Sequence, residues 1–156
     1  MSLNRVEALG KCFKINIKQK NQKQVHVFLD FPEEVLMIKD EANNQTVDKY
    51  TFSEILSVKP TGTQRIGSKD NPVLLYSFVI EMDLLSNIHL ACEDENDFEQ
   101  WIRCFWLIVK MIKLGIEPSK VNIFTFETHF KRQYDIYAGK AKKEVIESRA
   151  SERLMS

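Results

Sequence analysis

The sequence lacks the features that mark secreted, membrane-spanning and zinc-binding chains. It has only three cysteines, Cys12, Cys92 and Cys104, and no two of them form a Cys-x-x-Cys pair, so neither a disulfide framework nor a zinc site is predicted. No apolar run reaches the roughly 18 residues that a membrane-spanning helix needs. The opening MSLNRVEALGK has no apolar core of a signal peptide. These absences favour reduced thiols and a cytoplasmic location.

An excess of charge of one sign is also missing. The 22 Lys and Arg residues balance the 22 Asp and Glu residues, and the formal net charge is zero. A dedicated nucleic-acid-binding domain carries a clear basic excess, so we expect no nucleic-acid partner. The hydrophobic content of 44% supplies a packed core, and 156 residues suit one domain with an appendage.

The sequence contains none of the common catalytic motifs. GxGxxG, GxxxxGK[ST], GxSxG and HExxH are all absent. The histidines His26, His89 and His129 have no Cys, Asp or Glu partner at metal-ligand spacing. Cys104 lies in an apolar helical run, where an inert thiol is expected. We therefore expect a protein that is not an enzyme and that binds no metal and no cofactor.

What the sequence does contain is a series of short strand-like segments. The connection Thr61–Pro72 is predicted to be irregular, because it holds two glycines and a proline. No helical pattern interrupts the strands, which favours an antiparallel sandwich or barrel over parallel βαβ units. The predicted strands are Gly10–Lys18, Val25–Phe31, Glu34–Asp40, Val47–Thr51, Glu54–Lys59, Val73–Met82 and Asn87–Glu93.

One amphipathic helix follows the strands. Asp94 is its predicted N-cap, and Gly115 follows its last turn. An apolar stripe recurs at spacings of three and four residues and would close one open end of a barrel, with Trp101 as the plug. The stripe consists of Phe98, Trp101, Ile102, Phe105, Ile108, Val109 and Ile112.

The order of these segments resembles the pleckstrin-homology (PH) family over residues of about 9–114. The segments that carry the resemblance are GKCFK, VHVFLD, YTFSEILSVKPTG, YSFVIEM and NIHLACEDENDFEQWI, with Trp101 at the signature tryptophan of the family. The resemblance implies a mainly β fold with α: a seven-stranded antiparallel barrel or sandwich capped by a C-terminal helix. Residues 1–8 would then be a lead, and residues 115–156 a helical extension.

The resemblance also implies a candidate lipid site. Lipid-binding members carry a lysine on the first strand, a second basic residue, and a key arginine opening the second strand. Lys14 and Lys23 match the first two positions, whereas the key arginine falls on Val25. Because valine offers no partner to a phosphate, Lys18 and Lys20 in the same loop would compensate only in part. Membrane targeting through phosphoinositides is therefore the alternative hypothesis.

The extension carries a heptad-like apolar stripe that something must cover. Two interpretations stay open: the tail folds back on the outer face of the preceding helix, or the stripe, that face or both dock another protein. The stripe consists of Ile123, Phe126, Phe130, Tyr134, Tyr137, Ala141 and Val145. The outer face of the preceding helix consists of Trp106, Leu107, Met111 and Leu114.

From these residues, the leading hypothesis is a non-catalytic PH interaction module. It would bind a protein partner as a scaffold or adaptor in a larger assembly, cytoskeletal or ciliary in kind. We predict that its partner surface includes Trp106, Leu107, Met111, Leu114, Phe126, Phe130, Tyr134 and Tyr137.

Overall fold

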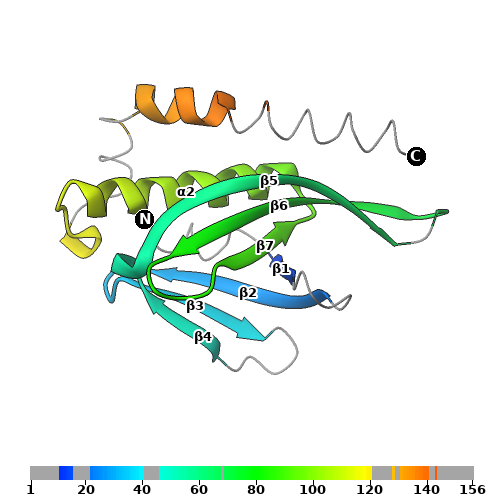
Figure 1. The fold of residues 1–156 in the computed structure, drawn as a ribbon, viewed down its shortest axis with the longest axis horizontal. Helices are drawn as coiled ribbons and strands as arrows, with labels where there is room; N and C mark the ends of the chain where they lie inside the picture. Colours follow the sequence, from blue (N-terminus) through cyan, green and yellow to red (C-terminus); the bar gives the residue numbers. More distant parts are fainter. Residues whose placement is uncertain are drawn as a thin grey trace.

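A computed structural model describes residues 11–15, 22–40, 46–67, 69–120, 128, 131–140 and 143 (Figure 1). Its strands are β1 (Lys11–Ile15), β2 (Gln22–Asp30), β3 (Val35–Asp40), β4 (Thr46–Thr51), β5 (Ile55–Gly67), β6 (Pro72–Met82) and β7 (Ile88–Cys92). They form one sheet in the order β4-β3-β2-β1-β7-β6-β5, and every neighbouring pair is antiparallel. The prediction of a mainly β, antiparallel fold is confirmed.

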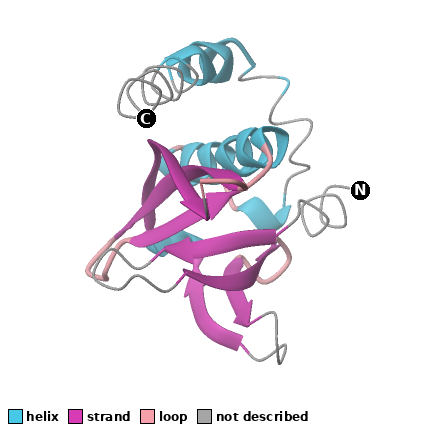
Figure 2. Cartoon of the chain, turned by 90° about the vertical axis from the view of Figure 1, so that its right-hand side faces the viewer, coloured by secondary structure: helices cyan, strands magenta, loops and turns pink. Residues whose placement is uncertain are grey.

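The sheet is curved and has two edges. In the part of the chain that the structure describes, no pairing joins β4 to β5, so the strands do not close into a barrel. The short helix η1 (Phe52–Glu54) leads from one edge strand to the other, and the Glu54 carboxylate accepts a hydrogen bond from the Thr51 amide at 3.1 Å. The helix α2 (Glu95–Lys113) lies along one side of the sheet, and η2 (Pro118–Lys120) follows it (Figure 1, Figure 2).

Strand β5 is much longer than predicted. The expectation of an irregular connection over Thr61–Pro72 is wrong, because β5 runs to Gly67 and pairs with β6 along its whole length. A register shift between Pro60 and Gly62 lets the ladder continue, and Gly62 takes a φ of 109° there. Pro60 is tolerated because β5 is an edge strand.

Helix α2 begins and ends as predicted. The Asp94 carboxylate accepts hydrogen bonds from the amides of Asn96 at 2.7 Å and Asp97 at 3.1 Å, which confirms it as the N-cap. After the helix ends at Lys113, Gly115 takes a φ of 72°, the left-handed conformation that favours glycine at this position.

The buried face of α2 is wider than the predicted stripe. Leu107 and Met111 are 1% and 0% exposed and belong to the core cluster, so neither is open to a partner in this structure. Helix α2 contacts β5, β6, β7, η1 and η2. The buried residues of α2 are Phe98, Trp101, Ile102, Cys104, Phe105, Leu107, Ile108, Val109 and Met111.

Trp101 lies at the centre of the contact between helix and sheet. Its side chain is fully buried and stacks on Phe105, with ring centroids 6.0 Å apart and an angle of 29° between the planes. Phe105 in turn contacts Phe78 of β6, with centroids 6.2 Å apart. The indole Nε1 of Trp101 has no hydrogen-bond partner among the described residues, so packing alone holds this ring.

Replacing Trp101 by alanine is expected to lower the free energy of unfolding by about 3–5 kcal/mol, because a cavity is left beneath α2. Trp101→Phe is expected to cost less than half as much, since it keeps the stacking on Phe105 and removes an unpaired N–H. Urea unfolding measures the free energy of unfolding of both variants. Leu114→Ala, on the exposed end of the helix, is the matched control and should change stability by less than about 0.5 kcal/mol. A Trp101→Ala cost as small as that of the control would contradict this role.

Candidate functional site

The described part of the tail lies over the outer side of α2. Residues 131–140 are helical and run alongside α2 on the side away from the sheet (Figure 1, Figure 2). Three rings join the two helices, and we name them the aromatic cluster: Trp106, Tyr134 and Tyr137. The Trp106 ring centroid is 5.6 Å from that of Tyr134 and 6.1 Å from that of Tyr137, and the two tyrosine rings are 6.5 Å apart.

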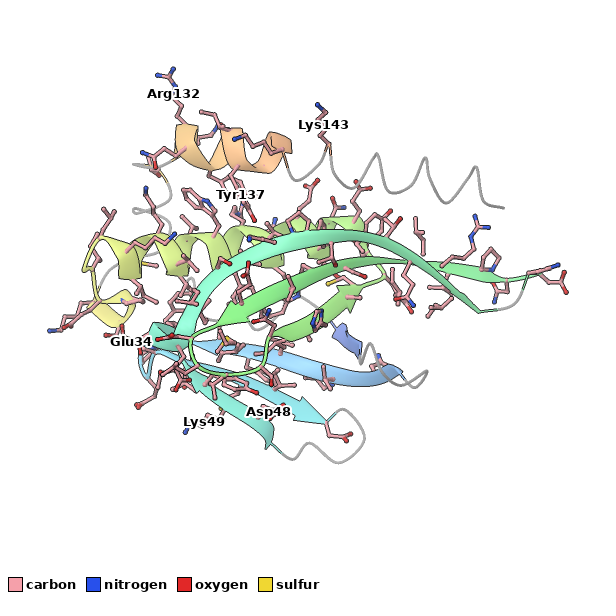
Figure 3. All side chains as sticks on the ribbon, viewed as in Figure 1. Glu34, Asp48, Lys49, Arg132, Tyr137 and Lys143 are labelled. Atoms are coloured by element: carbon pink, nitrogen blue, oxygen red, sulfur yellow. The ribbon has the colours of Figure 1, made fainter. Side chains whose placement is uncertain are left out.

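Tyr137 also bonds to the sheet. Its hydroxyl donates a hydrogen bond to the Val58 carbonyl oxygen at 2.7 Å, and the side chain points from the tail toward the domain (Figure 3). Val58 belongs to β5, an edge strand of the sheet. Edge strands present backbone groups that can pair with other chains, so the tail covers part of a vulnerable edge.

A cleft of about 330 Å³ lies beside the aromatic cluster, between the tail, α2 and β5. We call it the tail cleft. Its apolar walls come from Val58, Val109, Trp106 and Tyr137. The other residues that line it are Ser57, Lys59, Lys110 and Lys113.

One carboxylate lies against the polar side of the tail cleft. Glu81 Oε1 is 2.7 Å from Lys59 Nζ and accepts a hydrogen bond from the Ser57 hydroxyl at 2.8 Å. Hydrogen bonds from Lys59 and Ser57 hold the pKa of the Glu81 carboxyl below its ordinary value, so Glu81 stays ionised at neutral pH. Lys59, one of the three lysines that line the tail cleft, is therefore paired with this carboxylate.

The structure separates the residues that were predicted to form one partner surface. It brings Trp106, Tyr134 and Tyr137 together, as an intramolecular contact. Leu114 is 49% exposed at the end of α2. Phe126 and Phe130 lie outside the described residues. Of the predicted helix face, Trp106 is in contact with the described part of the tail, and Leu107 and Met111 are buried.

The predicted lipid site is described only through its backbone. Lys14 on β1 and Lys23 on β2 are directly opposite each other in the antiparallel register. Lys18 and Lys20 lie outside the described residues. Val25, at the position of the family's key arginine, is fully buried in the core, so packing accounts for its identity.

The sequence analysis missed an exposed apolar surface next to strand β6. Leu84 and Leu85 lie in the turn 83–87 between β6 and β7 and are 97% and 45% exposed, and Leu56 on β5 is 49% exposed. Ile55 pairs with Met82, the residue before the turn, and Leu56 is the next residue of β5. The backbone of Leu56 therefore lies near the start of this turn. We call Leu56, Leu84 and Leu85 the leucine turn. The sequence does place two adjacent leucines, Leu84 and Leu85, between two predicted strands, and this pattern could have indicated the exposed surface.

The backbone holds Leu84 in an unfavourable conformation. Its φ is 59°, in the left-handed region that leucine rarely adopts. Hydrogen bonds fix the turn on both sides: the Asp83 amide donates to the Glu54 carbonyl at 2.8 Å, and the Met82 amide donates to the Asn87 side chain at 3.2 Å. The leucine turn is therefore a fixed exposed feature.

Within the residues that the structure describes, no group of three or more His, Cys, Asp or Glu side chains is placed to hold a metal ion. None of the described helices is long and apolar enough to cross a membrane. Cys92 and Cys104 are buried and do not form a disulfide with each other.

Comparisons with known proteins identify no family. No family model matches the chain, and no curated protein matches it. A solved structure described as "Crystal Structure of L. pealei PLC21" aligns with a TM-score of 0.48 and 13% sequence identity. The alignment covers 64% of this chain and 15% of that one, so the chain spans a small part of it. A likeness of this size carries no argument about fold or function.

Tyr137→Phe is expected to weaken the attachment of the tail, because it removes the hydrogen bond to Val58 and keeps the ring. The free energy of tail opening should fall by about 0.5–1.5 kcal/mol, and amides of residues 131–140 should exchange with solvent correspondingly faster. Hydrogen exchange followed by mass spectrometry measures this. Ile136→Ala changes a 58% exposed residue of the same segment and is the control. Exchange that is unchanged in Tyr137→Phe would show that the bond does not hold the tail.

Proposed function

We propose that the chain is a non-catalytic, PH-like interaction module that binds a protein partner. The order of seven antiparallel strands followed by α2, with Trp101 buried beneath that helix, agrees with the resemblance to the PH family. The module would act in the cytoplasm as a scaffold or adaptor of a larger assembly, with a cytoskeletal or ciliary structure as the expected kind.

The observation that carries this proposal is the leucine turn. A large apolar side chain that stays in water lacks the stabilising free energy of about 1.5–3 kcal/mol that its burial would give. A non-glycine residue in the left-handed region costs on the order of 1–3 kcal/mol more, and Leu84 combines both conditions. Exposed apolar patches that the fold does not need commonly mark interaction sites. The leucine turn is thus a better candidate partner surface than the aromatic cluster, which the tail already covers.

A second candidate function is membrane targeting through phosphoinositides. The observation in its favour is the register that places Lys14 opposite Lys23, because it brings the backbones of two of the four predicted lysines together. Surface lysines near an anionic leaflet contribute roughly 1 kcal/mol each, which supports weak binding without headgroup selectivity. Val25 supplies no third cation.

The first test removes the leucine turn. The double substitution Leu84→Ser, Leu85→Ser should weaken binding of the native co-purifying partner by at least about tenfold, since even one buried leucine exceeds the 1.4 kcal/mol that corresponds to that factor. The measurement is affinity of the purified partner for the variant and the parent. Thermal unfolding should not change, because both side chains are exposed. Lys69→Ser, in the exposed turn between β5 and β6, is the control. Undiminished affinity in the double variant would remove the support for this surface.

The second test addresses lipids. We expect the parent chain to show no selective co-sedimentation with vesicles of any one phosphoinositide at physiological salt, because charges are screened within about 8 Å and the key cation is missing. The variant Lys14→Glu, Lys23→Glu should behave like the parent in this assay. Selective sedimentation of the parent that this variant loses would favour membrane targeting over protein binding.

A further inference from the structure

We propose that the leucine turn and a cleft beside it bind a basic segment of the partner protein, one that carries apolar residues next to lysine or arginine. The inference rests on the function proposed above and adds the chemical class of the partner. Three observations carry it: a partly apolar cleft, the backbone bonds that join this cleft to the leucine turn, and the excess of carboxylates around both.

A cleft of about 410 Å³ lies between the turn from β2 to β3, η1 and the segment that follows α2. We call it the acidic cleft, because glutamates line it together with apolar residues. The glutamates are Glu33, Glu34 and Glu117, and the apolar residues are Phe52, Ile112, Ile116 and Pro118. Lysine and arginine have a long apolar stem and a cationic head, so their side chains suit a lining of both kinds.

Helix η1 joins the acidic cleft to the leucine turn. On one side of η1, the Phe52 amide donates a hydrogen bond to the Glu34 carbonyl at 2.8 Å, and both residues line the cleft. On the other side, the Asp83 amide donates to the Glu54 carbonyl at 2.8 Å, and Asp83 directly precedes Leu84. Only the three residues of η1 separate the two features, so one segment of a partner can contact both.

Carboxylates outnumber ammonium groups at this end of the molecule. The described segments that line the acidic cleft or form the turn are 31–34, 51–54, 83–87 and 115–120. Their one basic residue is Lys120, and their acidic residues are Glu33, Glu34, Glu54, Asp83 and Glu117. Lys120 Nζ is 2.8 Å from a carboxylate oxygen of Glu117, so this lysine is already paired. Its hydrogen bond to Glu117, with the charge of Glu34 as a smaller cause, raises the pKa of Lys120 above its ordinary value.

The charge of this end favours a protein partner over a membrane. Exposed leucines in a turn could also enter a bilayer, but the cytoplasmic leaflet has a negative surface potential that repels carboxylates. A basic protein segment is attracted to the same carboxylates, and complementary charge speeds association and selects the partner. The leucine turn would supply the apolar contact, and Glu33 and Glu34 the charge that selects a basic segment.

The experiment titrates the full chain with a fluorescently labelled synthetic helical peptide made of leucine and lysine. One reference peptide has glutamate in place of every lysine, and a second has serine in place of every leucine. Fluorescence anisotropy should show that the leucine–lysine peptide binds at least about tenfold more tightly than either reference, with an affinity that falls as salt is added. No binding of this peptide, or equal binding of the leucine–glutamate peptide, would overturn the proposal.

Charge-removing variants test the location of the site. The double substitution Glu33→Gln, Glu34→Gln keeps the size of both side chains and should weaken binding of the leucine–lysine peptide about fivefold, the size expected for two exposed ion pairs. It should also reduce the dependence of the affinity on salt. Asp70→Asn removes a carboxylate charge from the exposed turn between β5 and β6 and is the matched control. Full affinity in the double variant, or an equal loss in Asp70→Asn, would overturn the proposal.

The same variants separate this inference from the proposed function when the purified native partner is used. Loss of affinity in Leu84→Ser, Leu85→Ser, with full affinity in Glu33→Gln, Glu34→Gln, would overturn the basic partner and leave the leucine turn as the binding surface. Full affinity in the leucine variant would overturn both.

Two other occupants of the surface have their own signatures. Sedimentation of the parent with anionic vesicles that Leu84→Ser, Leu85→Ser abolishes would assign the turn to a membrane and overturn the proposal. A dimer of the parent, seen by analytical ultracentrifugation and lost in Glu33→Gln, Glu34→Gln, would assign the surface to a second copy of the chain and would also overturn it.

Discussion

The structure depends on one contact above all, the packing of α2 against an antiparallel sheet whose edges do not meet. The buried apolar residues of the sheet and nine buried side chains of α2 form one core cluster. Trp101 and Phe105 form the centre of that layer. Asp94 fixes where the helix begins, directly after β7, so a capping interaction sets the position of the whole layer. Removal of the helix would expose both the core and the outer site that is built on it.

The outer side of α2 supports a second and weaker layer. The core contact is broad and apolar, whereas the described tail segment is held by the aromatic cluster and one tyrosine hydroxyl. Layers held by few buried apolar contacts open at lower free energy than the core. The two layers therefore differ in stability: the core keeps the leucine turn in a fixed geometry, and the described tail segment is expected to open before the core does.

Local patterns in the sequence predicted the parts of the fold that depend on local chemistry. Most strands agree with the structure within a few residues, and Asp94 and Gly115 mark the beginning and end of α2 as expected. The errors have tertiary causes. The extension of β5 through Pro60 and Gly62 depends on its place at the sheet edge. The burial of Leu107 and Met111 depends on elements around α2 that no helical periodicity reveals. The tail cleft combines residues from three segments far apart in the sequence, so no local pattern could show it.

We propose that the leucine turn, and not the surface under the tail, meets the partner. The most direct measurement is a map of backbone amide chemical-shift changes in the labelled chain when its purified native partner is added. We expect the largest changes at residues 83–87 and at Leu56, while the amides of Trp106, Tyr134 and Tyr137 keep their shifts. The largest changes at Trp106, Tyr134 and Tyr137, with none at Leu84 and Leu85, would contradict it and would show that the partner displaces the tail.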